Sequence, residues 1–160
     1  MCEANRDGLA TIADYQFGAG AGAALFGTED LEVRTSKSGR PTQILAPDGR
    51  LVTLGGDGRF TLGYAGGRRL AGVLAPPAYR VTVGDESEPF VRDGANAFAK
   101  FVLDVDPAVR PLDEVLVTDE NDTLLGVGRA ELSASAMAAF DRGVAVSVRE
   151  GRDEWADRDA

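Results

Sequence analysis

The side chains that most enzymes use for acid–base, nucleophilic or metal chemistry are scarce in this chain. It contains no histidine and a single cysteine, Cys2. These counts exclude a histidine-based triad, a histidine-containing zinc site and an intramolecular disulfide. Two pairs of neighbouring carboxylates remain, Asp104 with Asp106 and Asp113 with Glu114, but no partner base or metal-ligand set accompanies them. Because general acid–base chemistry needs such partners, we predict no catalytic residue, no metal site and no cofactor.

A glycine-rich stretch, Gly18 to Gly22, is the segment that most suggests a nucleotide-binding loop. It follows a predicted helix rather than a strand, and its spacing matches neither GxGxxG nor a P-loop. We therefore interpret it as a place where two helical segments pack closely.

Cationic side chains cluster in the first half of the chain. Arg34, Lys37 and Arg40 flank a predicted hairpin turn, where several cations and serine hydroxyls can meet successive phosphates of a nucleic acid. Arg68 and Arg69 lie together on a predicted helix and could reach a nucleic acid backbone in the same way. A solvated surface is the alternative for both groups.

A second candidate contact runs from Gly94 to Phe101. A glycine before a predicted strand lets a phosphate backbone approach closely, and Asn96 and Lys100 follow it. Phe98 or Phe101 could stack on an unpaired base, and alternation along a strand predicts that one of the two rings belongs to the core. The alternative for Lys100 is an ordinary surface lysine at a strand edge.

The composition indicates a salt-adapted surface. Of 17 cationic residues only two are lysines, and 16 of the 26 acidic residues are aspartates, which gives a net charge of −9. Such a balance is typical of halophilic organisms, although an acidic protein from a mesophile is the alternative. At about 1 M salt the Debye length is roughly 3 Å, so long-range steering hardly operates. Acidity therefore does not exclude nucleic acid binding.

The charge is distributed unevenly along the chain. Residues 1–84 carry nine cationic and eight acidic side chains, whereas residues 85–160 carry eight and eighteen. This asymmetry suggests two modules with different surfaces, and 160 residues are enough for two very small domains.

The elements predicted to position these residues are short. In the first half, periodicity predicts helices over 9–17 and 64–74, with a further turn at 23–26, and strands over 31–35, 41–46, 50–54 and 60–62. Strands follow over 79–83, 114–118, 123–131 and 144–148, with an apolar stretch over 97–105 and a short helix after Ser133. Many short strands with glycine-rich turns indicate a small barrel. Because we find neither a membrane-spanning run nor a secretion signal, we expect a cytoplasmic protein.

The order of motifs in the second half resembles a PUA domain. The blocks are Phe90-Val91-Arg92-Asp93-Gly94, Ala97 to Val102, Asp113 to Val117, Leu124 to Ala130, a serine-started helix and Gly143 to Val146. The resemblance implies a small pseudo-barrel that binds structured RNA. It also implies RNA contacts at Arg142 and Arg149, which bracket the last strand. Many PUA domains have glycine where this chain has Leu112, as a type II turn requires, so we expect a different local backbone there.

The first half looks like the domain that precedes PUA in archaeal tRNA-guanine transglycosylases. The matching motifs are Ile12 to Gly22, Arg34-x-Ser36-Lys37-Ser38-Gly39-Arg40, Gly58 to Gly63 and Arg68-Arg69-Leu70. In that family the C-terminal domains grip tRNA, while a separate barrel holds the catalytic aspartates and a zinc site. Neither that barrel nor a zinc ligand set is found in this chain.

We therefore expect an α+β protein with a small N-terminal α+β module over 1–78, a PUA-like mixed β pseudo-barrel over 79–151 and a disordered acidic tail over 152–160. The expected function is that of a non-catalytic, tRNA-binding accessory to tRNA base modification, such as archaeosine formation. The alternative is a protein-interaction module that docks a catalytic or ribosome-associated partner, and an enzyme in its own right is a third hypothesis. Expected partners are tRNA or another structured RNA and a catalytic tRNA-modifying subunit, with no membrane and no DNA.

Overall fold

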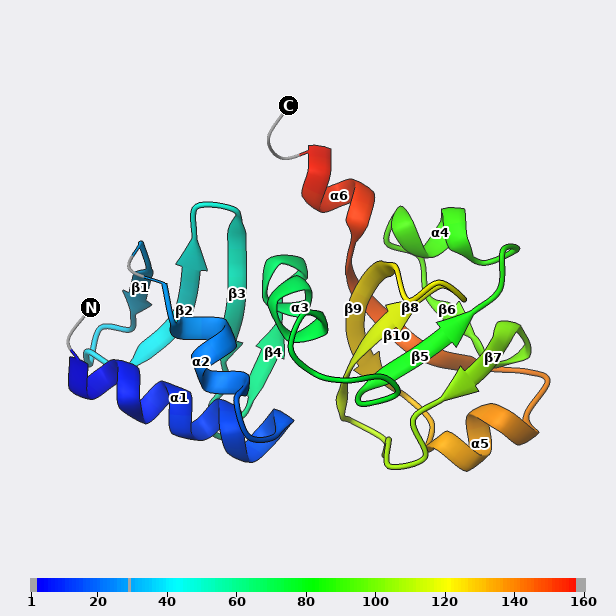
Figure 1. Cartoon of the computed structure of the whole chain (residues 1–160), viewed down its shortest axis with the longest axis horizontal. Helices are drawn as coiled ribbons and strands as arrows, with labels where there is room; N and C mark the ends of the chain where they lie inside the picture. Colours follow the sequence, from blue (N-terminus) through cyan, green and yellow to red (C-terminus); the bar gives the residue numbers. More distant parts are fainter. Residues whose placement is uncertain (1–2, 29, 158–160) are drawn as a thin grey trace. The chain divides into compact units, whose positions relative to one another are not determined.

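A computed structural model describes residues 3–28 and 30–157 of the chain (Figure 1). The chain divides into two compact units, residues 1–74 and 75–160. The division falls between Leu74 and Ala75, slightly before the boundary we expected after residue 78. Each unit has a sheet and a core of its own, so each is described by itself.

The first unit is a four-stranded antiparallel meander with three helices. Its sheet has the order β1-β2-β3-β4, so each strand pairs with the next one in the chain. The elements are α1 (Glu3–Phe17), α2 (Ala21–Phe26), β1 (Glu32–Thr35), β2 (Pro41–Ala46), β3 (Gly49–Leu54), β4 (Phe60–Leu62) and α3 (Tyr64–Ala71).

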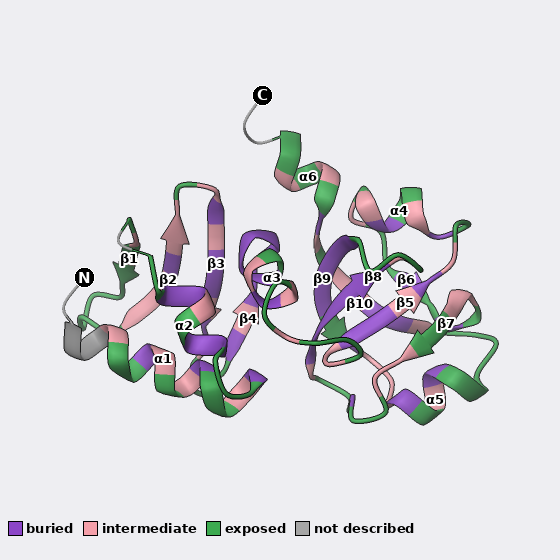
Figure 2. Ribbon diagram, in the orientation of Figure 1, coloured by how far each residue is buried: buried purple, intermediate pink, exposed green. Residues whose placement is uncertain are grey.

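One face of α1 is buried in the core of the first unit, where α1 packs against α2. Leu9, Ala13 and Phe17 recur every four residues, and all three are buried. In the same core the rings of Phe26 and Phe60 meet edge to face, with centroids 5.8 Å apart. Figure 2 shows the buried stripe on α1 as purple bands. The helical period seen in the sequence therefore sets which face of α1 is covered.

The glycine-rich stretch brings α1 and α2 together. A Cβ atom at Gly22 would overlap the backbone of Ala10, so only glycine fits at this crossing. The amide of Gly22 also donates a hydrogen bond of 2.7 Å to Asp14 Oδ1, which satisfies a donor at the start of α2. The interpretation of this stretch as close helix packing is confirmed.

The second unit is a nearly closed barrel of mixed strands. Its sheet has the order β6-β10-β9-β8-β5-β7, in which β5 and β8 run parallel and the other pairs antiparallel. The edge strands β6 and β7 are joined through a single 3-10 turn, η1, which brings the two edges of the sheet together. The elements are β5 (Arg80–Val83), α4 (Glu88–Arg92), β6 (Ala97–Phe98), η1 (Ala99–Phe101), β7 (Val102–Val105), β8 (Glu114–Thr118), β9 (Leu124–Ala130), α5 (Ala134–Ala139), β10 (Val144–Gly151) and α6 (Arg152–Asp157).

Small β-branched side chains fill the barrel. Val81, Val115, Val117 and Val146 are fully buried, and Met137 of α5 belongs to the same cluster. Valine suits this position because its branched side chain packs well on a pleated surface. The α+β class and the pseudo-barrel predicted from the sequence are both confirmed.

The backbone at Leu112 corrects one expectation. Leu112 has a φ of 77°, in the left-handed region that glycine normally occupies, and its amide donates a hydrogen bond of 2.8 Å to the carbonyl of Ala130. The glycine-type turn is therefore kept with a leucine in it, because this hydrogen bond holds the turn against the sheet.

The segment after β10 corrects another expectation. Residues 152–157, predicted as part of a disordered tail, form the helix α6 next to α4 and the end of β10. The amide of Gly151 donates a hydrogen bond of 2.9 Å to Glu154 Oε1, which caps the first turn of α6. Residues 158–160 lie outside the described part of the chain. Helix α4 was also not predicted, because residues 84–89 are polar and turn-rich.

In the described ranges, 3–28 and 30–157, we find no helix with the length and apolar character needed to cross a bilayer.

Candidate nucleic-acid interface

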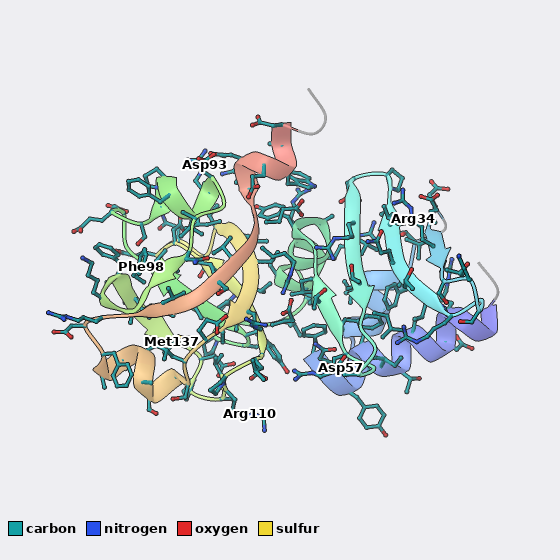
Figure 3. All side chains as sticks on the ribbon, turned by 180° about the vertical axis from the view of Figure 1, so that it is seen from behind. Arg34, Asp57, Asp93, Phe98, Arg110 and Met137 are labelled. Atoms are coloured by element: carbon teal, nitrogen blue, oxygen red, sulfur yellow. The ribbon has the colours of Figure 1, made fainter. Side chains whose placement is uncertain are left out.

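Three residues predicted to contact RNA meet at the edge of the second unit's sheet. Phe98 pairs with Val144, and the amide of Ala99 donates a hydrogen bond of 2.9 Å to the carbonyl of Gly143. This pairing brings the backbone of the segment that carries Arg142 next to the segment that carries Phe98 and Lys100. Both cations are exposed, as is 45% of Phe98, which Figure 3 labels. We call Phe98, Lys100, Phe101 and Arg142 the β6 surface.

The lysine of the β6 surface sits over an aromatic ring. Lys100 Nζ is 4.9 Å from the ring centroid of Phe101, within cation–π range. Phe101 is half-buried and Phe98 is exposed, so the prediction that one of these rings belongs to the core is wrong. The 3-10 turn η1 breaks the strand between them, and alternation with a period of two no longer applies. The result is an exposed ring, a half-exposed ring and two cations together.

The glycine predicted as an RNA approach point is covered in this structure. Gly94 has a φ of 97°, and the space in which its Cβ would lie holds the carboxylate of Glu154 from α6. Nearby, Asn96 Oδ1 accepts a hydrogen bond of 3.0 Å from the amide of Val148, where β10 bulges. Asn96 therefore fastens the loop before β6 to β10, which is a structural role.

Arg149 of β10 is paired with a buried acid of the same sheet. Its guanidinium donates two hydrogen bonds to the carboxylate of Glu114, at 2.5 and 3.0 Å, and Glu114 is only 4% exposed. A bidentate pair of this kind neutralises both charges. Arg149, predicted as an RNA contact, thus forms an ion pair with the buried carboxylate of Glu114.

A second paired arginine, Arg129, lies on β9, the neighbour of β10 in the sheet. Arg129 donates hydrogen bonds to Glu131, which also accepts one of 2.7 Å from Ser147 Oγ. The hydrogen bond from Arg129, followed by that from Ser147, holds the pKa of the Glu131 carboxyl below its ordinary value. This face of β9 and β10 is therefore polar but internally compensated.

The structure brings two of the three cations of the predicted hairpin cluster together at one end of the first unit's sheet. Lys37 is exposed in the turn between β1 and β2, and Arg40 follows it, with its guanidinium donating to the carbonyl of Gly55. This contact brings the β3–β4 turn to the same end of the sheet, so Arg59 joins Lys37 and Arg40 there. Arg34 lies further along β1, 4.0 Å from Glu32.

The two arginines of α3 have different surroundings. Arg69 donates hydrogen bonds of 2.9 Å to the carbonyl of Leu25 and 3.1 Å to Thr28 Oγ1, and it lies 3.5 Å from Asp48. It therefore ties α3 to the end of α2 and to the β2–β3 turn. Arg68 is exposed, so the two do not form one patch as predicted.

Sequence reasoning missed two surface residues as candidates for RNA contact, Tyr15 and Arg59. Tyr15 on α1 is 90% exposed. The side chain of Gln16, its neighbour, exchanges hydrogen bonds of 2.8 and 2.7 Å with the backbone of Phe60, which places the end of α1 beside Arg59. Arg59 is visible in the sequence as a cation near a glycine turn, but only the fold places it with Lys37 and Arg40.

Across the described residues there is no group of three or more cysteine or acidic side chains arranged to hold a metal ion. The arrangement instead offers short-range contacts to a polyanion, through guanidinium and ammonium groups beside exposed rings.

Family comparisons give these two units a context. Residues 7–77 match the family described as the patch-forming domain C2 of tRNA-guanine transglycosylase, and residues 79–152 match the PUA domain family. The chain thus carries a C2 domain followed by a PUA domain. The β6 surface belongs to the PUA domain, and the cluster of Lys37, Arg40 and Arg59 belongs to the C2 domain.

A curated relative extends across both domains. The chain is 47% identical to the tRNA-guanine(15) transglycosylase of Pyrococcus furiosus over 147 residues, which is 91% of this chain and 25% of that protein. The chain therefore spans about a quarter of the length of the curated relatives it matches.

Solved structures support the fold. A hypothetical protein from Pyrococcus horikoshii aligns over 100% of this chain and 98% of its own, with a TM-score of 0.73 and 22% identity. A PUA domain protein from Aeropyrum pernix aligns over 98% and 89%, with a TM-score of 0.68 and 20% identity. At these identities the likeness concerns the fold alone.

Proposed function

We propose that this protein binds tRNA and acts as a non-catalytic accessory to a tRNA-modifying enzyme. The observation that carries the proposal is the β6 surface, where the fold gathers two cations and an exposed ring from distant segments of a PUA domain. The identity to tRNA-guanine(15) transglycosylases across both domains supports tRNA as the RNA and base modification as the process.

The chemistry of the β6 surface suits an unpaired stretch of RNA. Phe98 offers a face for stacking on a base, which is worth roughly 1–3 kcal/mol per base. Lys100 and Arg142 flank it and meet adjacent phosphates or 2′-hydroxyls. Because these contacts are short, they remain effective at high salt, where the long-range repulsion between RNA and the acidic second unit is screened.

The C2 domain supplies a second contact in this proposal. Lys37, Arg40 and Arg59 lie at one end of its sheet, and the guanidinium of Arg40 is already held by the carbonyl of Gly55. An arginine that is ordered before binding loses less side-chain entropy when it meets a phosphate. We propose that this end contacts the tRNA backbone without reading its sequence.

The test is tRNA binding by the purified chain at about 1 M KCl, where the Debye length is roughly 3 Å. Lys100→Ala and Phe98→Ala should each weaken binding about tenfold, in line with the loss of one stacking or charged contact. Arg110→Ala is the matched control, because Arg110 is an exposed arginine of the same unit at a distance from Phe98 (Figure 3). Equal losses in Lys100→Ala and Arg110→Ala, with no loss in Phe98→Ala, would mean that general electrostatics rather than the β6 surface binds the RNA.

A second candidate is docking of a catalytic protein subunit. A groove of about 400 Å³ lies between β7 and α5, lined by apolar residues that include Leu103, Val105 and Ala134. Leu103 is 58% exposed on an edge strand, and exposed apolar surface of this kind is typical of interaction sites. Absence of tRNA binding at any salt, together with binding to a tRNA-modifying enzyme that Leu103→Asp abolishes, would favour this candidate.

A further inference from the structure

Helix α6 covers the loop that precedes β6. The carboxylate of Glu154 fills the space beside the α-carbon of Gly94, at the position where the sequence predicts close approach of a phosphate backbone. Figure 3 shows Asp93, the residue before Gly94, beside α6. A negatively charged oxygen of the protein therefore occupies the place at which an RNA phosphate oxygen would lie.

The same helix neutralises the cation of that loop. Asp153 Oδ1 is 3.1 Å from the guanidinium of Arg92, and Glu88 is 4.0 Å from it. Arg92 is the nearest arginine before Gly94 in the chain. Its positive charge is therefore paired with the carboxylates of Asp153 and Glu88. Two adjacent acids of α6 thus contact the two groups of the loop that a phosphate would use. Asp153 pairs with the guanidinium of Arg92, and the carboxylate of Glu154 lies beside the α-carbon of Gly94.

Helix α6 is held by contacts that can be exchanged. None of its residues is buried, and the Asp153–Arg92 pair is partly exposed on both sides. Exposed ion pairs contribute little to stability. An incoming polyanion can therefore replace these polar contacts one for one.

We infer that α6 is a displaceable acidic cover over an RNA phosphate contact formed by Arg92 and Gly94. The inference rests on the proposed tRNA binding and adds its regulation: RNA competes with Asp153 and Glu154 for this loop. The β6 surface remains open, so RNA engages Phe98 and Lys100 before it displaces α6.

The chain carries its own reporter for this step. Trp155, the single tryptophan of the protein, lies in α6 and is half-buried there. Displacement of α6 into water should move its fluorescence emission to longer wavelength as tRNA is added to the full chain. A shift to shorter wavelength would mean that RNA packs onto α6 instead of replacing it, which overturns the inference.

Isosteric variants test the competition directly. Asp153→Asn with Glu154→Gln removes both charges while an amide oxygen at 154 still caps Gly151. This double variant should bind tRNA about five- to tenfold more tightly than the wild type. That factor is at the lower end of the affinity changes that are typical of two coupled binding events. The matched control is Glu120→Gln with Asp104→Asn, which removes two exposed acids of the same unit that lie outside α6.

The outcomes separate the inference from the function it rests on. Tighter binding by the α6 variant than by the control, with the red shift of Trp155 in the wild type, supports the cover. Equal binding by the two double variants, with tRNA still bound by the wild type, overturns the cover and leaves tRNA binding intact. If neither the wild type nor any variant binds tRNA, the proposed function fails and the cover fails with it.

Discussion

Leu112 holds a backbone conformation that costs leucine free energy. Its φ of 77° is in the left-handed region, while 58% of its side chain is exposed, so little burial compensates the cost. Leu112→Gly should raise the free energy of unfolding by about 1 kcal/mol, because glycine adopts this conformation without a Cβ clash. Denaturant unfolding measures the change. Leu112→Ala keeps the Cβ and should bring no gain, and Leu103→Gly, equally exposed but in a strand, should destabilise.

The pair of Arg149 and Glu114 makes a different prediction at the same scale. Arg149→Ala leaves the buried carboxylate of Glu114 without its two charged hydrogen bonds, and it should lower the free energy of unfolding by about 2 kcal/mol. Adding Glu114→Gln should recover part of that loss in the same denaturant measurement, because a neutral amide costs less to bury. A loss of tRNA affinity in Arg149→Ala with unchanged stability would contradict a structural role for this arginine.

At the scale of the elements, α1 and α2 can cross closely only because Gly22 has no Cβ atom. Gly22→Ala would push a Cβ into the backbone of Ala10 and should destabilise the first unit by about 3 kcal/mol, the upper range for overpacking. Gly8, in the middle of α1, has no atom within 4 Å of a Cβ built on it. Gly8→Ala should therefore stabilise by about 1 kcal/mol through helix propensity alone. Thermal unfolding of the two variants checks the opposite signs.

At the scale of the whole molecule, the two units carry different charge. Residues 1–74 hold eight cationic and eight acidic side chains, while residues 75–160 hold nine and eighteen. Raising KCl from about 0.1 M to about 1 M shortens the Debye length from roughly 10 to 3 Å and screens repulsion within the second unit. Amide hydrogen exchange should slow more in the second unit than in the first. An equal response of both units would show that salt acts through hydration rather than through net charge.

The local elements were largely predictable because their signals lie within a few residues. The four-residue spacing of Leu9, Ala13 and Phe17 predicts the buried face of α1, and Ser133 predicts the start of α5, where its hydroxyl accepts from the amide of Ala136. Helix α6 was missed because four of its six residues are charged. It is held by Arg92, which lies far away in the chain, and no local pattern reports such a partner.

What the sequence by itself determined is therefore the class of the protein: the α+β elements, the domain types, and the residue kinds able to meet RNA. The tertiary structure alone decided which of those residues act together. Arg69 and Arg149, alike in sequence to the exposed arginines, are engaged by Leu25 and Glu114, while Phe98, Lys100 and Arg142 meet at one sheet edge. The physical reason is that a charged side chain has no fixed role of its own. Its role depends on which distant groups the strand pairing places within hydrogen-bonding reach.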